Sequence, residues 1–415
     1  MRVVAHAGSV LLALGGGAFV ALYALIAFDR VGSGSDLREA GALAGLGVAA
    51  LVAAALVELA VLRRRGAMMI EHLWMPPLWL TFGLFVLATG VGGIAVWADR
   101  VPAAEPAIAL VGVTAMAMFF WRLALRWSPN RRAPAYSMLA TLAWGMVVAT
   151  TTAVVMQLAF IAAGVGGIAA GLRVADVHVQ GGLLDTLLAE GFLEESGSEL
   201  AGTATVAMFV MLAYAVAAPL TEELTKFLGV VVVMRRRVLS RYTAFVAGIS
   251  VGLGFAVFET IGYALGSGEG WPLVLAVRAP VTLIHVTGTS LVACGWYLQQ
   301  RRGGFLLLGY FVAAVLVHAA WNGLLVSVML ASASMPTSGD PDPMLVLAIL
   351  GALGLMLLLL GSCLTWVIAN ARRWGREFSD PYAGRVPVPA LTVPRHAVYG
   401  VERVNAVSGP LSREV

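Results

Sequence analysis

The feature that most limits the possible folds of this chain is a series of long apolar segments, every second one of which ends at a cluster of arginines. Each is about 20 residues long or longer, which is the length that an α-helix needs to cross the hydrocarbon core of a bilayer. Inside that core every backbone N–H and C=O group must be paired within the protein, so apolar runs of this length are expected to be helical. The sequence therefore predicts an all-α polytopic membrane protein.

The composition agrees with a membrane protein. Hydrophobic residues make up 60% of the 415 residues and charged residues only 12%, about half of the ~25% found in soluble domains. The net charge of +4 does not indicate nucleic-acid binding, because the basic residues stand in short clusters between apolar runs, the pattern of topology determinants. Cys294 and Cys363 both fall within predicted spans, so we interpret them as small buried residues and not as a disulfide.

We predict about ten membrane-spanning helices from the apolar runs. Their approximate bounds are 7–28, 40–62, 74–97, 106–125, 136–172, 213–234, 242–265, 272–298, 305–330 and 344–369. The fifth is longer than one span requires, so it is expected to tilt or to break near its glycines between 164 and 171.

These spans divide the chain into five parts. The predicted parts are an N-terminal five-helix membrane region of unassigned role (1–172), an acidic loop (173–202), a core of four helices with polar groups (203–330), a last helix with its preceding loop (331–370) and a tail (371–415). The tail is rich in Pro and Arg and has no periodic apolar pattern, so it is expected to be disordered.

The arginine clusters also predict the orientation. They lie on alternate connections between spans, and the connections between them carry most of the acidic residues. By the positive-inside rule, both termini lie in the cytoplasm and the acidic loop lies outside, in a multi-pass protein of the cell membrane.

The second informative feature is a set of polar side chains inside four consecutive spans. The sixth span carries Glu222, Glu223 and Lys226, and the next three carry Glu259, His285, and His318 with Asn322. Each charge at that depth costs at least about 2.5 kcal/mol, so such groups are expected to face protein or water and to have a function. Lys226 follows the two glutamates by four and three residues, so on a helix it can reach either.

Depth along the four helices favours a common site. Counted from the arginine clusters at 1.5 Å per residue, the polar residues of all four helices lie near the membrane midplane or somewhat toward the outside. A few converging N and O ligands suit a metal ion, and a catalytic metal site keeps one position for water. Our hypothesis is that a metal-bound or carboxylate-activated water attacks a peptide carbonyl inside the membrane. One glutamate of the pair would take part in the reaction and the other would fix its geometry.

Short motifs at these positions resemble those of a known family. The segment 222–226 matches EExxK, 255–259 matches FxxxE, a single His285 follows, and 318–322 matches HxxxN, where the family often has HxxxD. In this order the motifs resemble the PrsW family of intramembrane metalloproteases, which is distantly similar to the CAAX prenyl endopeptidases. The resemblance covers about residues 203 to 330.

The resemblance implies roles for individual residues. Glu222 would activate the water, and Glu259, His285 and His318 would bind a divalent metal, with zinc expected. Glu223, Lys226 and Asn322 would complete the catalytic site. Because Asn322 stands where the family often has an acid, it weakens the assignment of a carboxylate ligand at this position. The implied partner is a single-span membrane protein in the lipid bilayer, because the family is associated with cleaving membrane-anchored anti-sigma factors on the outer side.

Three other interpretations remain open at this point. A buried Glu–Lys pair is often only a tie between helices. An ion-coupled transporter would use the same groups as a proton relay, although we find no repeat between the first five and the last five spans. A scaffold would keep the fold and bind a partner without cutting it, which Asn322 leaves possible. Changing Glu222 to Gln would abolish the product of a protease but leave a scaffold's binding intact.

Overall fold

The computed structural model describes residues 76–98, 104–126, 135–174, 204–234, 240–335 and 342–377, together with scattered helical residues between 10 and 58. These described residues form helices and no strands, which confirms the all-α fold. Eight helical segments among them are long and apolar enough to cross a membrane, and they coincide with the third to the tenth predicted spans. The first two predicted spans (apart from those scattered residues), nearly all of the acidic loop and the tail after residue 377 lie outside the described part.

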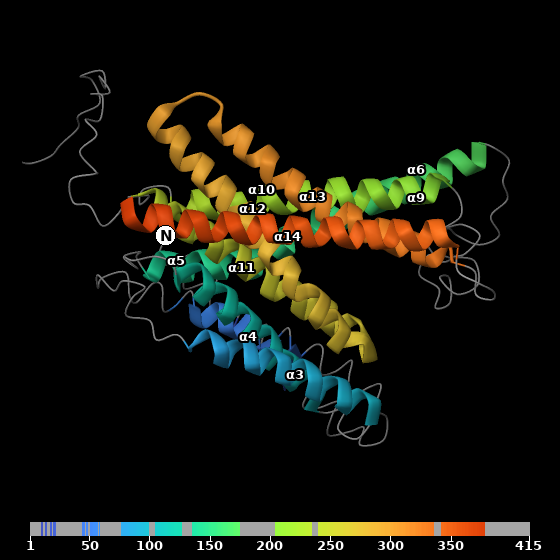
Figure 1. The fold of residues 1–415 in the computed structure, drawn as a ribbon, viewed down its shortest axis with the longest axis horizontal. Coiled ribbons are helices and arrows are strands. Elements are labelled where there is room, and N and C mark those ends of the chain that lie inside the picture. Colours follow the sequence, from blue (N-terminus) through green and yellow to red (C-terminus); the bar gives the residue numbers. More distant parts are fainter. Residues whose placement is uncertain are drawn as a thin grey trace, which may run out of the picture. The chain divides into compact units, whose positions relative to one another are not determined.

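Figure 1 shows these helices in the colours of the sequence. In chain order they are α3 (Leu78–Ala98), α4 (Glu105–Arg126), α5 (Ala135–Ala143), η4 (Trp144–Ala149), α6 (Thr150–Val174), α9 (Ala204–Met211), η6 (Leu212–Ala217), α10 (Ala218–Met234), α11 (Arg241–Gly266), η7 (Gly268–Gly270), α12 (Trp271–Arg302), α13 (Leu306–Ala333) and α14 (Pro343–Glu377). Helices α6 and α9 lie side by side (Figure 1), where the rings of Phe160 and Phe209 stack with centroids 6.1 Å apart.

Two of the spans contain a π-helical turn, η4 in α5–η4–α6 and η6 in α9–η6–α10. The fifth predicted span therefore does not break near its glycines: α6 stays helical through residue 174, and the irregularity lies earlier, at η4. The turn η6 ends two residues before Pro219. A proline in a helix has no N–H to donate and its ring clashes with the carbonyl four residues back, here Ala215 inside η6. The wider π turn gives that carbonyl room.

Helix α11 lies at the centre of the packing. In its most apolar stretch 83% of the residues are buried, because glycines let two neighbouring backbones come close. A Cβ at Gly254 would overlap the carbonyl oxygen of Leu142 in α5, and one at Gly252 would lie 2.5 Å from the carbonyl oxygen of His285 in α12. This close approach sets the polar residue of α12 beside those of α11.

Helix α14 continues past the end predicted for the last span, to Glu377. Its last turns are held by aromatic contacts, with Trp374 buried and packed edge-to-face on Phe245 of α11 at 5.3 Å. The guanidinium of Arg241 lies 5.7 Å from the Trp374 ring. These contacts explain why the helix extends into the region that we predicted to be the start of the tail.

Candidate active site

Helix α10 places three charged side chains in the protein interior. Glu222, Glu223 and Lys226 have exposed fractions of 4%, 0% and 0%. The Nζ of Lys226 lies 2.7 Å from Oε1 of Glu223 and 3.4 Å from Oε2 of Glu222. The lysine therefore reaches both glutamates, as its spacing on the helix predicted, and one ammonium offsets part of the charge of two carboxylates.

His285 of α12 lies between the lysine and a third carboxylate. Its Nδ1 is 2.8 Å from Nζ of Lys226, and its Nε2 is 2.9 Å from Oε2 of Glu259 on α11. An ammonium can only donate a hydrogen bond, so Nδ1 accepts and the ring proton sits on Nε2, which donates to Glu259. The lone pair of Nδ1 consequently points toward the glutamates of α10, and Glu222 Oε2 lies 3.8 Å away.

His318 of α13 is held in the same manner from the other side. Its Nδ1 lies 3.0 Å from Oε1 of Glu223 and donates to that carboxylate, so its lone pair is on Nε2. That Nε2 lies 3.7 Å from Oε2 of Glu222. The rings of His285 and His318 meet edge-to-face with centroids 4.9 Å apart. Both histidines thus direct a lone pair toward the same oxygen of Glu222.

These three residues form a group suited to a divalent metal. One ligand atom each from Glu222, His285 and His318 lie within 4.8 Å of one another, and all three residues are buried. Two imidazoles and one carboxylate are a donor set of catalytic zinc sites. In such sites the second nitrogen of each histidine bonds to a carboxylate or carbonyl, as Glu259 and Glu223 do here. Because the ammonium of Lys226 contacts Nδ1 of His285, a bound ion would replace it at that nitrogen.

Glu259 lies on the far side of the His285 ring from this group. It is half-buried, and it forms an ion pair with Arg278 of α12 besides accepting the His285 hydrogen bond. The guanidinium of Arg278 also lies 4.8 Å from the ring of Tyr263. Arg278 lies within a membrane-spanning helix, and this ion pair gives its charge a partner inside the protein. The sequence resemblance implied Glu259 as a ligand together with His285 and His318, whereas in the structure Glu222 lies with the two histidines.

Asn322 is not brought to the buried group. It follows His318 by one helical turn, and its side-chain Nδ2 donates to the backbone carbonyl of Tyr214 in η6, 2.9 Å away. This bond links α13 to the π turn that precedes the two glutamates.

Two residues of the fifth span contact α10 at this site and were missed by the sequence analysis. Gln157 of α6 donates from Nε2 to Oε1 of Glu222 at 3.0 Å, and Trp144 of η4 donates from Nε1 to the carbonyl of Thr225 at 3.2 Å. The side-chain amide of Gln157, alone in a long uncharged span, is a signal that could have been used. Trp144 gives no such signal, because tryptophans are frequent in membrane helices.

Comparison with known proteins places this site in context. A family model described as PrsW family intramembrane metalloprotease matches residues 133–357, just over half of the chain. The match begins well before the region of the four motifs, so it includes the span that carries Trp144 and Gln157. No curated protein and no solved structure matches the chain.

Proposed function

Because the chain belongs to the PrsW family of intramembrane metalloproteases, we propose that it hydrolyses a peptide bond of a membrane-anchored protein with a divalent metal ion held by Glu222, His285 and His318. The observation that carries this proposal is the convergence of these three side chains within 4.8 Å. The remaining nitrogen of each histidine is already bonded to a carboxylate, which is the arrangement that orients metal ligands.

We expect zinc, because two histidines and a glutamate are the donor set of catalytic zinc sites in hydrolases. A metal of this kind makes water a nucleophile near neutral pH and polarises a substrate carbonyl. The protein's own residues prepare the site: Glu259 and Glu223 fix the two imidazole rings, and Gln157 holds the second oxygen of Glu222. Lys226 offsets the negative charge of the two glutamates while they are buried.

A second candidate chemistry is supported by the position of Lys226. Its ammonium lies among Glu222, Glu223 and His285, where it supplies a positive charge without any metal. In that case Glu222 would take the proton of the attacking water directly, in the role that the sequence resemblance implies, and the histidines would orient the water and the substrate carbonyl.

Metal analysis of the purified full-length chain, together with cleavage of a panel of single-span membrane peptides, tests the proposal. We expect about one bound metal per chain, cleavage that stops on chelation and returns with zinc, and loss of cleavage in Glu222→Gln. Cleavage that persists in the metal-free protein would replace the metal proposal by the direct role of Glu222. A folded protein that neither binds metal nor cleaves any peptide would favour the transporter or scaffold interpretation.

We extend the proposal to partner and location. The substrate would be a single-span membrane protein such as an anti-sigma factor, cut near the outer side of the cell membrane, and both termini would be cytoplasmic. The alternating arginine clusters support this orientation. Both native cysteines are buried and free, so after their replacement by Ala, single cysteines placed in the loops can be mapped with an impermeant reagent. Labelling of the loops that carry the arginine clusters from the outside would contradict the orientation.

A further inference from the structure

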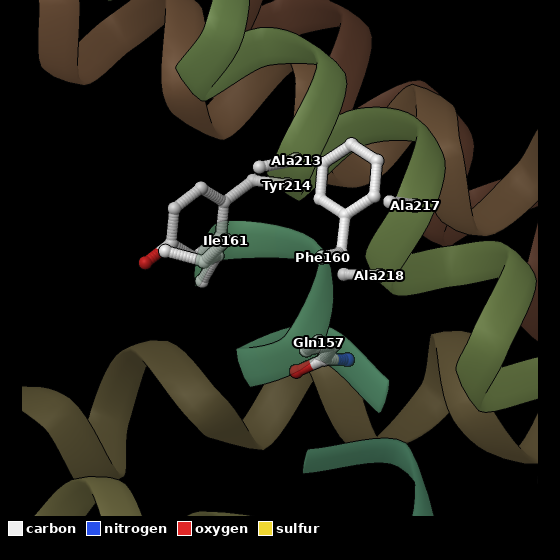
Figure 2. A pocket seen from close by; sticks show the side chains of 7 residues that line it. All are labelled: Gln157, Phe160, Ile161, Ala213, Tyr214, Ala217 and Ala218. Atoms are coloured by element: carbon white, nitrogen blue, oxygen red, sulfur yellow. The ribbon is translucent and has the colours of Figure 1, made fainter. Parts of the chain in front are cut away.

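A small hollow adjoins the site, between α6 and the π turn η6. Figure 2 shows the side chains that line it, which are Gln157, Phe160, Ile161, Ala213, Tyr214, Ala217 and Ala218. The empty space among them is about 230 Å³, including the part open to the surroundings. Because this figure includes space open to the surroundings, the hollow is shallow, and it suits part of one side chain rather than a separate ligand.

The hollow is connected to the candidate active site through two residues. Gln157 lines it and also donates its hydrogen bond to Oε1 of Glu222. Ala218 lines it from α10, four residues before Glu222, and residues at that spacing share a helix face. A peptide whose scissile carbonyl lies at Glu222 would therefore place a neighbouring side chain over this hollow.

The walls of the hollow are apolar except for the Gln157 amide and the Tyr214 hydroxyl. Three alanines form the side toward η6 and α10, and the space exists because their side chains are short. The aromatic ring of Phe160 is fixed by its stacking on Phe209. No charged side chain is among the lining residues, so an ionised substrate group there would lose its hydration without gaining a partner.

The backbone that carries this wall is held from α13. Asn322 donates to the carbonyl of Tyr214, whose side chain lines the hollow. Within a membrane a backbone carbonyl depends on the protein for its hydrogen bonds. Asn322 is therefore suited to fix the π turn, and with it the position of the three alanines.

We propose that this hollow is a shallow specificity pocket that receives one apolar side chain, such as Leu, next to the scissile bond of the substrate. Asn322 is then a positioning residue that acts through the pocket wall. This inference rests on the proposed function and deepens it by naming a feature of the substrate.

The test measures kcat/KM for single-span peptides that carry Leu, Ala or Asp in turn at each position flanking the cleavage site. At one of these positions wild type should prefer Leu to Ala and to Asp by about 10-fold or more. Ala217→Leu fills the hollow and should remove that preference, while cleavage of the Ala peptide is retained. Ala159→Leu is the matched control, because Ala159 is exposed on the same α6 helix outside the pocket, and it should keep the wild-type preference. Asn322→Ala should raise KM for the Leu peptide while kcat and metal content change little.

Each alternative outcome has a distinct meaning. Equal losses for all peptides in Ala217→Leu, or a wild type without side-chain preference, would overturn the pocket and leave the protease intact. Thermal unfolding shows whether Ala217→Leu is folded, and if it is not, the smaller change Ala213→Val makes the same test. A folded wild type that cleaves no peptide of the panel contradicts the proposed function itself. A fall in kcat for Asn322→Ala at unchanged KM would instead place Asn322 in the chemical step.

Discussion

Glu259 accepts a hydrogen bond from Nε2 of His285 at 2.9 Å, and this contact between α11 and α12 determines which nitrogen of the histidine faces the glutamates of α10. His318 is held by the same chemistry through its other nitrogen, with Glu223 as the acceptor. Two carboxylates thus orient two imidazoles toward a third carboxylate, Glu222. Glu222, His285 and His318 are therefore the residues suited to bind a metal, whereas Glu259 and Glu223 position the two histidines.

That separation predicts different effects of substitutions at Glu259 and His285. His285→Ala removes a proposed ligand, so stoichiometric metal should be lost. Glu259→Gln keeps an oxygen that can accept from Nε2 but loses its charge, and the metal affinity should fall by about 10- to 100-fold. Titration of the metal-free protein against a chelator of known affinity measures both. If Glu259→Gln lost the metal as completely as His285→Ala, Glu259 would be a ligand, as the sequence resemblance implies.

The ion pair of Arg278 with Glu259 predicts that substitutions at these two residues have non-additive effects on stability. Arg278→Gln leaves the half-buried Glu259 without its cation, so thermal stability in detergent should fall. Adding Glu259→Gln removes the stranded charge and should restore part of the loss, with a coupling of about 0.5–3 kcal/mol. Both side chains are partly exposed, so we expect the lower half of this range. Strictly additive effects would show that the contact contributes little to stability.

The close approach of α11 to α5 predicts a strong effect of a single methyl group. Gly254→Ala would place a Cβ so close to the carbonyl oxygen of Leu142 that the two atoms overlap. Overpacking of this kind costs about 1–3 kcal/mol or more. Gly262→Ala on the same helix is the control, because a Cβ there meets nothing within 4 Å. The melting temperature of Gly254→Ala should fall clearly while that of Gly262→Ala stays near wild type. Similar values for the two variants would contradict the packing of α11 against α5.

The hydrogen bond from Gln157 to Glu222 predicts a catalytic effect from a residue outside the four motifs. Gln157→Leu removes the donor, and a bond to a charged group is worth about 1.5–3 kcal/mol, or roughly a 10- to 100-fold loss of kcat/KM. Gln157→Glu has the same size but no N–H to donate and adds a negative charge, so its loss should be at least as large. The measurement is peptide cleavage by variants of matched folded fraction. Unchanged rates in both variants would show that Glu222 needs no support from α6.

Much of this arrangement could be predicted from the sequence for one physical reason. A charge in an apolar span has few favourable places, so the groups at 222, 226, 259 and 285 were expected to meet, and the structure brings them into contact. The spans themselves follow from run length, and the eight within the described residues are helical.

The order of contacts within the site could not be predicted. Helical spacing gives the face and the depth of a residue, but the crossing of α11 over α12 decides that Glu259 meets Nε2 of His285, which leaves Nδ1 facing Lys226 and Glu222 of α10. The π turns could not be predicted either, because the apolar pattern continues through them. Only η6 has a proline nearby, Pro219, that could indicate it. Gln157 carries no charge, so hydropathy does not distinguish its span from a packing helix.

The placement of the ion pairs also bears on how the chain enters the bilayer. Lys226 and Glu223 are neighbours on one helix, so α10 can cross with that pair already formed and with less exposed charge. Glu259 has its cation on the following helix, and an unpaired carboxylate at that depth costs at least about 2.5 kcal/mol. Only the short segment around Gly268–Gly270 separates the two helices. Insertion of α11 and α12 together as a hairpin is therefore favoured, because Arg278 and Glu259 then neutralise each other before either helix is exposed to lipid.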